Sequence, residues 1–194
     1  RALSVGVESV DIRQRHGDLE ETLLEQEEAM RLIVLGRRGA SAETTHRDLG
    51  RNVERVVRAL HKPILTVTEG FKEPERVMFA FDGGAITRRG VETVARSQLF
   101  RDLPILLCMS GKASADGEKK LEAARARLAD AGLDVTAELE PGDAETVIAR
   151  KVRDNDIGLL IMGAFGHSVL RSLLFGSKTA DLLRSSTVPT LLLR

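Results

Sequence analysis

The sequence predicts an α/β fold in which an open parallel sheet is covered by helices. Two observations carry this prediction. Short apolar runs alternate along residues 74–194 with stretches that have the spacing of an amphipathic helix, and this alternation is typical of βαβ units. A glycine loop after Met162 also joins one apolar run to one helical stretch, which is how parallel α/β folds form an anion site.

Five apolar runs in residues 74–194 are predicted to be strands of one parallel sheet. They are Val77–Phe81, Ile105–Met109, Leu133–Leu139, Leu159–Met162 and Thr190–Leu193. Three of the intervening helices each place four apolar side chains on one face, which is expected to cover the sheet. These faces are formed by Val91, Val94, Ala95 and Leu99, by Leu121, Ala124, Leu128 and Ala131, and by Ala144, Val147, Ile148 and Val152.

The same pattern occurs earlier in the chain, which indicates a duplication. Pro63 precedes an apolar run as Pro189 does, and the pair Gly17-Asp18 matches Gly142-Asp143. The offset between matching positions stays at 125 to 127 residues, and chance similarity does not keep register in this way. We therefore predict two units, at residues 1–70 and 74–194, which form two tandem copies.

The first copy is predicted to be incomplete, because Arg1 aligns near Ala126. Its predicted elements are a strand at Val5–Ile12, a helix from Asp18, a strand at Leu32–Leu35, a helix with Val53, Val56, Val57 and Leu60 on one face, and a strand at Ile64–Val67. We expect about fifty further residues to precede Arg1 in the natural protein, since a repeat unit needs its full set of strands to bury its apolar faces.

Composition narrows the possible functions. Lys plus Arg and Asp plus Glu balance at 29 each, and aromatic residues make up only 3%, so the chain is a poor candidate for nucleic-acid binding, which uses a basic face. No apolar run approaches the roughly 18 residues of a membrane span. Cys108 is the single cysteine, so no internal disulfide can form, and a reducing, cytoplasmic location is expected. Its place in an apolar run indicates core packing.

The candidate binding loop contains three glycines and a serine at fixed spacing. Gly163 and Gly166 follow an apolar run, and Gly176-Ser177 comes nine residues later, before a stretch with helical spacing. Glycines allow backbone to approach a phosphate closely, and helix amides favour its charge. The spacing is neither that of Walker A nor G-x-G-x-x-G. A purely structural turn is the alternative.

This G-x2-G-x9-G-[S/T] spacing resembles the signature of the universal stress protein family, in its nucleotide-binding branch. The resemblance covers essentially all of residues 74–194, and more loosely 5–68. It implies a tandem protein of the adenine nucleotide alpha hydrolase-like fold, with strand order 3-2-1-4-5 in each open sheet. It further implies that the second unit binds ATP or a related adenine nucleotide, with or without Mg²⁺, in stress response or signalling rather than dedicated catalysis.

The resemblance also implies roles for individual residues. Asp82 would meet the adenosine part of the ligand, and an Asp-Gly turn or a helix cap is the alternative explanation. Met109 and Met162 match positions beside the adenine, or are simply core residues. Gly163 and Gly166 would pass under the ribose and the phosphates.

The start of the last helix completes the implied site. Gly176 and Ser177 would offer the phosphates backbone amides and one hydroxyl, and Ser177 would also suit the N-cap of that helix. Lys178 departs from the family, which usually has a small apolar residue there. Its ammonium would either reach a phosphate or point to solvent.

In the family, the last strands of two units often pair across a dimer interface. Residues 64–67 and 190–193 would be these strands here, in a homo-oligomer or an intramolecular pseudo-dimer, because an exposed apolar edge strand needs a partner. The first copy has Arg51 in place of the serine, and Arg37-Arg38 between its first two glycines, so at most one nucleotide per chain is expected. Two alternatives remain: a nucleotide-free interaction module, and a slow metal-dependent ATP hydrolase. We assign no catalytic residue and no metal ligand.

Overall fold

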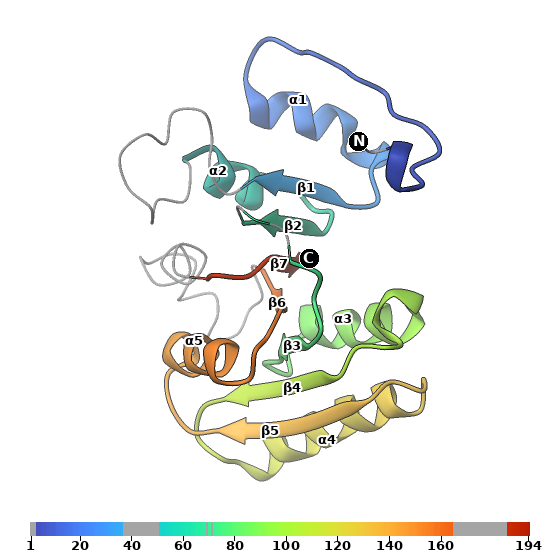
Figure 1. Ribbon diagram of the computed structural model, residues 1–194. Helices are drawn as coiled ribbons and strands as arrows, with labels where there is room; N and C mark the ends of the chain where they lie inside the picture. Colours follow the sequence, from blue (N-terminus) through green and yellow to red (C-terminus); the bar gives the residue numbers. More distant parts are fainter. Residues whose placement is uncertain (1–2, 37–50, 69, 71, 165–185) are drawn as a thin grey trace.

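The computed structural model describes residues 3–36, 51–68, 70, 72–164 and 186–194, which form one mostly parallel sheet flanked by helices (Figure 1). The sheet has seven strands in the order β1-β2-β7-β6-β3-β4-β5. Neighbouring strands are parallel except β2 and β7, which are antiparallel. The strands are β1 (Ile33–Gly36), β2 (Ile64–Val67), β3 (Val77–Ala80), β4 (Ile105–Ser110), β5 (Val135–Glu140), β6 (Leu159–Gly163) and β7 (Thr190–Leu193).

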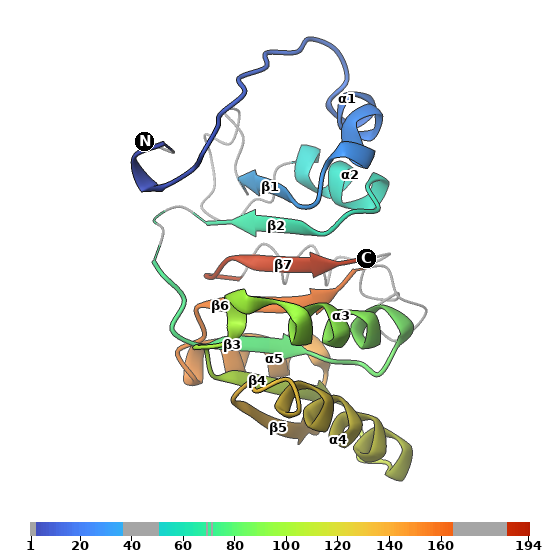
Figure 2. The ribbon, with the colours of Figure 1, turned by 90° about the vertical axis from the view of Figure 1, so that its right-hand side faces the viewer.

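The helices lie on both faces of this sheet. They are α1 (Leu19–Gln26), α2 (Arg51–Ala59), α3 (Ala85–Arg96), α4 (Ala115–Ala129) and α5 (Ala144–Asp154), with short 3-10 helices at Leu3–Val5, Glu27–Ala29 and Gln98–Phe100. The buried side chains of α3 and α4 pack in one core cluster, and those of α2 and α5 pack in the other. Figure 2 shows α3 and α4 in front of the sheet and α5 behind it.

The alternation of side chains along each strand fills these two clusters. In β3, Phe79 faces α3 and α4, whereas Met78 and Ala80 face the side of α5. All four residues of β3 are buried, which explains why the strand is an unbroken apolar run rather than an alternating one. Gly90 allows α3 to lie close to the sheet, because a Cβ there would stand 2.2 Å from Leu193 Cδ1.

Most predicted elements are present within two residues of their predicted bounds. The order β7-β6-β3-β4-β5 of the last five strands agrees with the expected order 3-2-1-4-5. The sheet itself is larger than the predicted five strands. The reason is that β7 pairs with β6 on one side and with β2 on the other, so the two parts of the chain share one continuous sheet.

Two predictions from the apolar pattern were wrong. Val5–Ile12 is not a strand. After the 3-10 helix at Leu3–Val5 the segment has no regular structure, and Val5 and Ile12 are 77% and 89% exposed. No described strand pairs with this segment, and apolar alternation alone does not hold a strand without a partner. Leu99 is also exposed, because α3 ends at Arg96 and the following 3-10 helix buries Phe100 instead.

The contact between β2 and β7 confirms the predicted pairing of residues 64–67 with 190–193. Ile64 pairs with Leu192, Leu65 with Leu191, and Thr66 with Thr190. The buried Thr66 hydroxyl also donates to the Thr190 carbonyl, 3.3 Å away. Just beyond β7, the guanidinium of Arg194 donates to the carbonyls of Arg58 and Leu60, so it satisfies acceptors at the end of α2.

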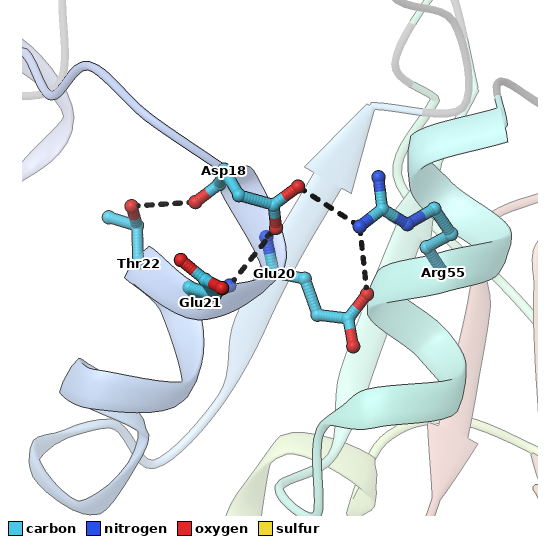
Figure 3. Close-up of polar contacts among 5 residues, drawn as sticks. All are labelled: Asp18, Glu20, Glu21, Thr22 and Arg55. Carbon is cyan, nitrogen blue, oxygen red and sulfur yellow. Dashed lines mark hydrogen bonds and ion pairs between the residues drawn. The ribbon is translucent and has the colours of Figure 1, made fainter.

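The first helix is fixed by its N-cap residue, which also joins it to α2 (Figure 3). Asp18 Oδ1 accepts from the amides of Glu20 and Glu21, and Arg55 of α2 donates to Asp18 Oδ2 over 3.0 Å. The same guanidinium lies 3.2 Å from Glu20. Chiefly through its hydrogen bond, Arg55 holds the pKa of Asp18 below its usual value. The predicted helix start at Asp18 is thereby explained.

Candidate functional site

The candidate site lies at the carboxyl edge of β3 and β6, where the strand order reverses. From β3 the chain runs outward through β4 and β5, and then returns to place β6 on the other side of β3. Ala80 of β3 lies opposite Met162 of β6, so Asp82 and Gly163 follow at the same edge. In open α/β sheets, ligands bind at such a reversal.

Asp82 is held in a tight turn between β3 and α3. Its Oδ1 accepts from the amide of Gly84 over 2.8 Å and from the hydroxyl of Thr87 over 2.5 Å. Gly83 has φ +71°, which suits glycine and explains the Asp-Gly-Gly sequence. The turn role that the sequence left open is therefore present, whereas the N-cap residue of α3 is Gly84. A carboxylate has about four acceptor positions, so this role is compatible with binding a ligand.

Gly163 ends β6 against the first turn of α3. A Cβ at this position would stand 3.1 Å from Thr87 Cγ2 and 3.3 Å from Ile86 Cγ2, which is closer than ordinary van der Waals contact. A side chain at this position would therefore force Thr87 or Ile86 to shift by a few tenths of an ångström, whatever binds at the edge. The carboxyl ends of β3 and β6 are linked through α3, because Thr87 of this helix contacts both the turn at Asp82 and the end of β6 at Gly163.

The two methionines expected beside the adenine are not brought together. Met109 belongs to the core cluster of α3 and α4, whereas Met162 belongs to the cluster of α2 and α5 on the opposite face of the sheet. Both are buried. Met109 lies nearer to the Asp82 turn, since its Cε would be 3.7 Å from a Cβ at Gly83.

The remaining predicted site residues lie outside the described residues. These are Gly166, Gly176, Ser177 and Lys178. In the first half, Arg37 and Arg38 are likewise outside them.

Two residues of the site were not found from the sequence. Thr87 is 1% exposed and contacts both strand ends. The available signal was its spacing of four residues from Val91, which places a hydroxyl on the buried face of α3. Lys120 of α4 covers Gly83, since its Cδ would be 3.1 Å from a Cβ there, and its ammonium pairs with Asp116. No sequence signal distinguished this lysine from other surface lysines.

The chemistry of the described residues is simple. Burial raises the pKa of the Cys108 thiol to about 11, so it is a protonated core residue at neutral pH, as its place in an apolar run indicated. Residues 3–36, 51–68, 72–164 and 186–194 contain no group of three His, Cys, Asp or Glu side chains placed to hold a metal ion. None of the described helices is long and apolar enough to span a membrane.

The strand order and the Asp82–Gly163 edge define a doubly wound α/β protein with its candidate site at the reversal point. Comparison with known proteins gives the family. The sequence profile of the Universal stress protein family matches residues 108–194. Universal stress protein Slr1230 of Synechocystis is 38% identical over 191 residues, covering 97% of this chain and 67% of that protein. The chain therefore belongs to the universal stress protein family.

Solved structures share the fold at low sequence identity. A universal stress protein from Archaeoglobus fulgidus superposes with a TM-score of 0.70 at 21% identity, over 91% of this chain. The present chain spans 65% of its length. A universal stress protein solved in complex with cAMP superposes with a TM-score of 0.51 at 20% identity, over 62% of this chain and 97% of that one.

Proposed function

We propose that this protein binds ATP or a related adenine nucleotide in its second unit, residues 74–194, and acts in stress response or signalling rather than as a dedicated catalyst. The nucleotide would lie at the carboxyl edge of β3 and β6. Asp82 would accept from the adenosine part, and the glycine loop that begins at Gly163 would receive the phosphates. The structure solved with cAMP supports the ligand class, since it shares this fold.

The observation that carries the proposal is the placement of Asp82 and Gly163. One follows β3 and the other ends β6, in parallel neighbouring strands at the reversal of strand order. A carboxylate is suited to sugar hydroxyls or an exocyclic amine, because it accepts hydrogen bonds without donating any. Bare backbone is suited to phosphate, because amides can approach it closely. The two chemistries that a nucleotide requires are adjacent at this edge.

We further propose that the chain is a tandem protein whose two units form an intramolecular pseudo-dimer. In both halves a loop with a positive-φ glycine precedes a helix that begins after an aspartate, at Gly17-Asp18 and at Gly142-Asp143. In both halves the last two strands are parallel neighbours. The register of β2 with β7 supports the same view, because Leu65 pairs with its own repeat equivalent, Leu191.

The nucleotide content of the purified protein tests the binding proposal. The protein is denatured in acid, and the released compounds are separated and identified by absorbance and mass. Calorimetric titration of nucleotide-free protein with ATP, AMP and cAMP, each with and without Mg²⁺, then ranks the ligands. We expect one adenine nucleotide per chain. Guanine nucleotides of equal charge should not bind more tightly than adenine nucleotides.

Three results would contradict the proposal in different ways. Protein that neither carries nor binds any adenine nucleotide would instead be a nucleotide-free interaction module. Steady turnover of ATP that requires Mg²⁺ would make it a slow metal-dependent hydrolase. Two tightly bound nucleotides per chain would contradict the assignment of the site to the second unit alone.

A further inference from the structure

We propose that Thr87 is a positioning residue of this nucleotide site. Its hydroxyl holds the Asp82 carboxylate, and its methyl group contacts the end of β6 at Gly163. The inference rests on the proposed function, because it assigns to Thr87 a share of the affinity of the same site. Thr87 itself lies on α3 beneath the edge and is 1% exposed, so it acts through its neighbours.

The hydroxyl of Thr87 is committed to Asp82. It lies 2.5 Å from Asp82 Oδ1 and 3.3 Å from the carbonyl oxygen of Gly84. A hydroxyl has one proton to donate, and the shorter contact, which has the length of an O–H···O⁻ bond, takes it. The Gly84 amide donates to the same Oδ1 over 2.8 Å. Two donors from the start of α3 therefore fix the orientation of this carboxylate.

Burial makes this hydrogen bond persistent. A hydroxyl shielded from water is costly unless it is hydrogen-bonded, and the Thr87 side chain is almost fully shielded. The bond is thus expected before any ligand arrives. A carboxylate that is already oriented loses less conformational freedom when a ligand binds, which favours affinity.

The methyl group of Thr87 sets the distance to the other strand. A Cβ at Gly163 would stand 3.1 Å from Thr87 Cγ2, so the methyl group lies directly against the end of β6. A threonine side chain is stiff about χ1, and its two branches are therefore held in a fixed relation. One residue thereby sets the position of Asp82 relative to the first glycine of the loop.

Two substitutions separate these contributions. Thr87→Val keeps the shape and removes the hydroxyl, whereas Thr87→Ser keeps the hydroxyl and removes the methyl group. Thr93→Val is the matched control, because the exposed Thr93 hydroxyl on the same helix donates only to the Arg89 carbonyl. The affinity of each nucleotide-free variant for ATP and AMP is measured by calorimetry. Hydrogen exchange of the Gly84 amide reports on the carboxylate without any ligand.

We expect Thr87→Val to weaken binding about tenfold, because the Asp82 carboxylate is then no longer oriented before the ligand arrives. Thr87→Ser should weaken binding less, by about threefold, since the bond to the carboxylate remains and only the contact with the end of β6 is lost. Exchange of the Gly84 amide should accelerate in Thr87→Val and stay unchanged in Thr93→Val. In an Asp82→Ala background, Thr87→Val should cause no additional loss of affinity, because the group it positions is gone.

The outcomes distinguish this inference from the proposed function. Wild-type protein that binds no adenine nucleotide would overturn the proposed function, and the role of Thr87 in affinity with it. Wild-type protein that binds, with Thr87→Val binding equally well, would overturn only the inference. Equal losses in Thr87→Val and Thr87→Ser would assign the effect to general packing, and additive losses with Asp82→Ala would place Thr87 outside the action of that carboxylate.

Discussion

Leu65 of β2 pairs directly with Leu191 of β7, and the two residues are equivalent in the duplication that we propose. The flanking pairs lie symmetrically about this central pair: Ile64 faces Leu192, and Thr66, the equivalent of Leu192, faces Thr190, the equivalent of Ile64. A pairing that is symmetric about one pair of equivalent residues is the arrangement of an isologous interface between two copies. Here it lies within one chain and joins the halves into a single sheet.

Asp82→Ala is predicted to weaken the binding of an adenine nucleotide by about 1.5–3 kcal/mol, the range for hydrogen bonds to a charged group. It should also lower the free energy of unfolding without ligand by about 1–2 kcal/mol, because the Gly84 amide and the Thr87 hydroxyl lose their acceptor. Calorimetry and urea unfolding measure the two effects. The exposed Asp130→Ala is the control, and equal effects in both variants would contradict the prediction.

Gly163→Ala is predicted to destabilise the protein by about 1–3 kcal/mol, the usual cost of forcing a methyl group into a packed site. The new Cβ would lie 3.1 Å from Thr87 Cγ2. In a Thr87→Ser background that methyl group is absent, so the same substitution should cost less. Thermal unfolding of the two single variants and the double variant measures the coupling. Additive losses would show that the contact does not exist.

Cys108 is predicted to be inert toward alkylation in the native protein. Burial raises the pKa of this thiol to about 11 from 9.0, and only the thiolate is reactive. Since the folded state binds the proton more tightly, this group favours folding below pH 9 and loses that contribution as the pH rises toward 11. Iodoacetamide labelling at pH 8, with and without urea, tests the first point. Cys108→Ala should remove that part of the alkaline loss of stability.

Glu27 is predicted to stabilise the fold above acidic pH. Burial would raise its pKa, but the amides of Lys62 and His61 and the imidazole of His61 outweigh this, so the pKa is lowered from 4.5. A lowered pKa means that the stabilisation is present above pH 4.5 and is lost as the pH falls further. Glu27→Gln should therefore lower the melting temperature at pH 7 more than in acid.

The control for this experiment is the next residue in the chain. Glu28 is exposed, whereas Glu27 is 8% exposed and accepts from the backbone of the loop before β2. Glu28→Gln is expected to leave the melting temperature unchanged across the same range of pH. A melting temperature of Glu27→Gln that stays parallel to the wild type from pH 7 to acid would contradict the assignment.

The sequence was sufficient for most of the fold because buried strands leave a strong local pattern. Leu159 to Met162 and Thr190 to Leu193 are apolar runs bounded by loop residues, and both are strands. The pattern failed at Val5–Ile12, since alternation describes a side-chain arrangement and contains no information about a partner strand. It failed at Leu99 because a helix end shifts the buried position by one residue.

The candidate site was predictable only where a residue type is itself unusual. Asp82 and Gly163 stand out because a charge and a glycine interrupt apolar strand ends, and the structure places both at one edge. Thr87 does not stand out, since threonine at a helix start has many uses. Its role depends on a distance of 2.5 Å to a side chain five positions earlier, and such a contact follows from tertiary packing rather than from spacing.

The pairing of β2 with β7 also has a consequence for how the protein folds. Thr66 and Thr190 are 124 residues apart in the chain, and the entropy of closing a loop grows with its length. Contacts within each half involve shorter loops and are expected to form first. Joining the halves should therefore be the slow step of folding. Partial unfolding of the native protein is expected to begin at the contact between β2 and β7 and to release the two halves as separate cooperative units.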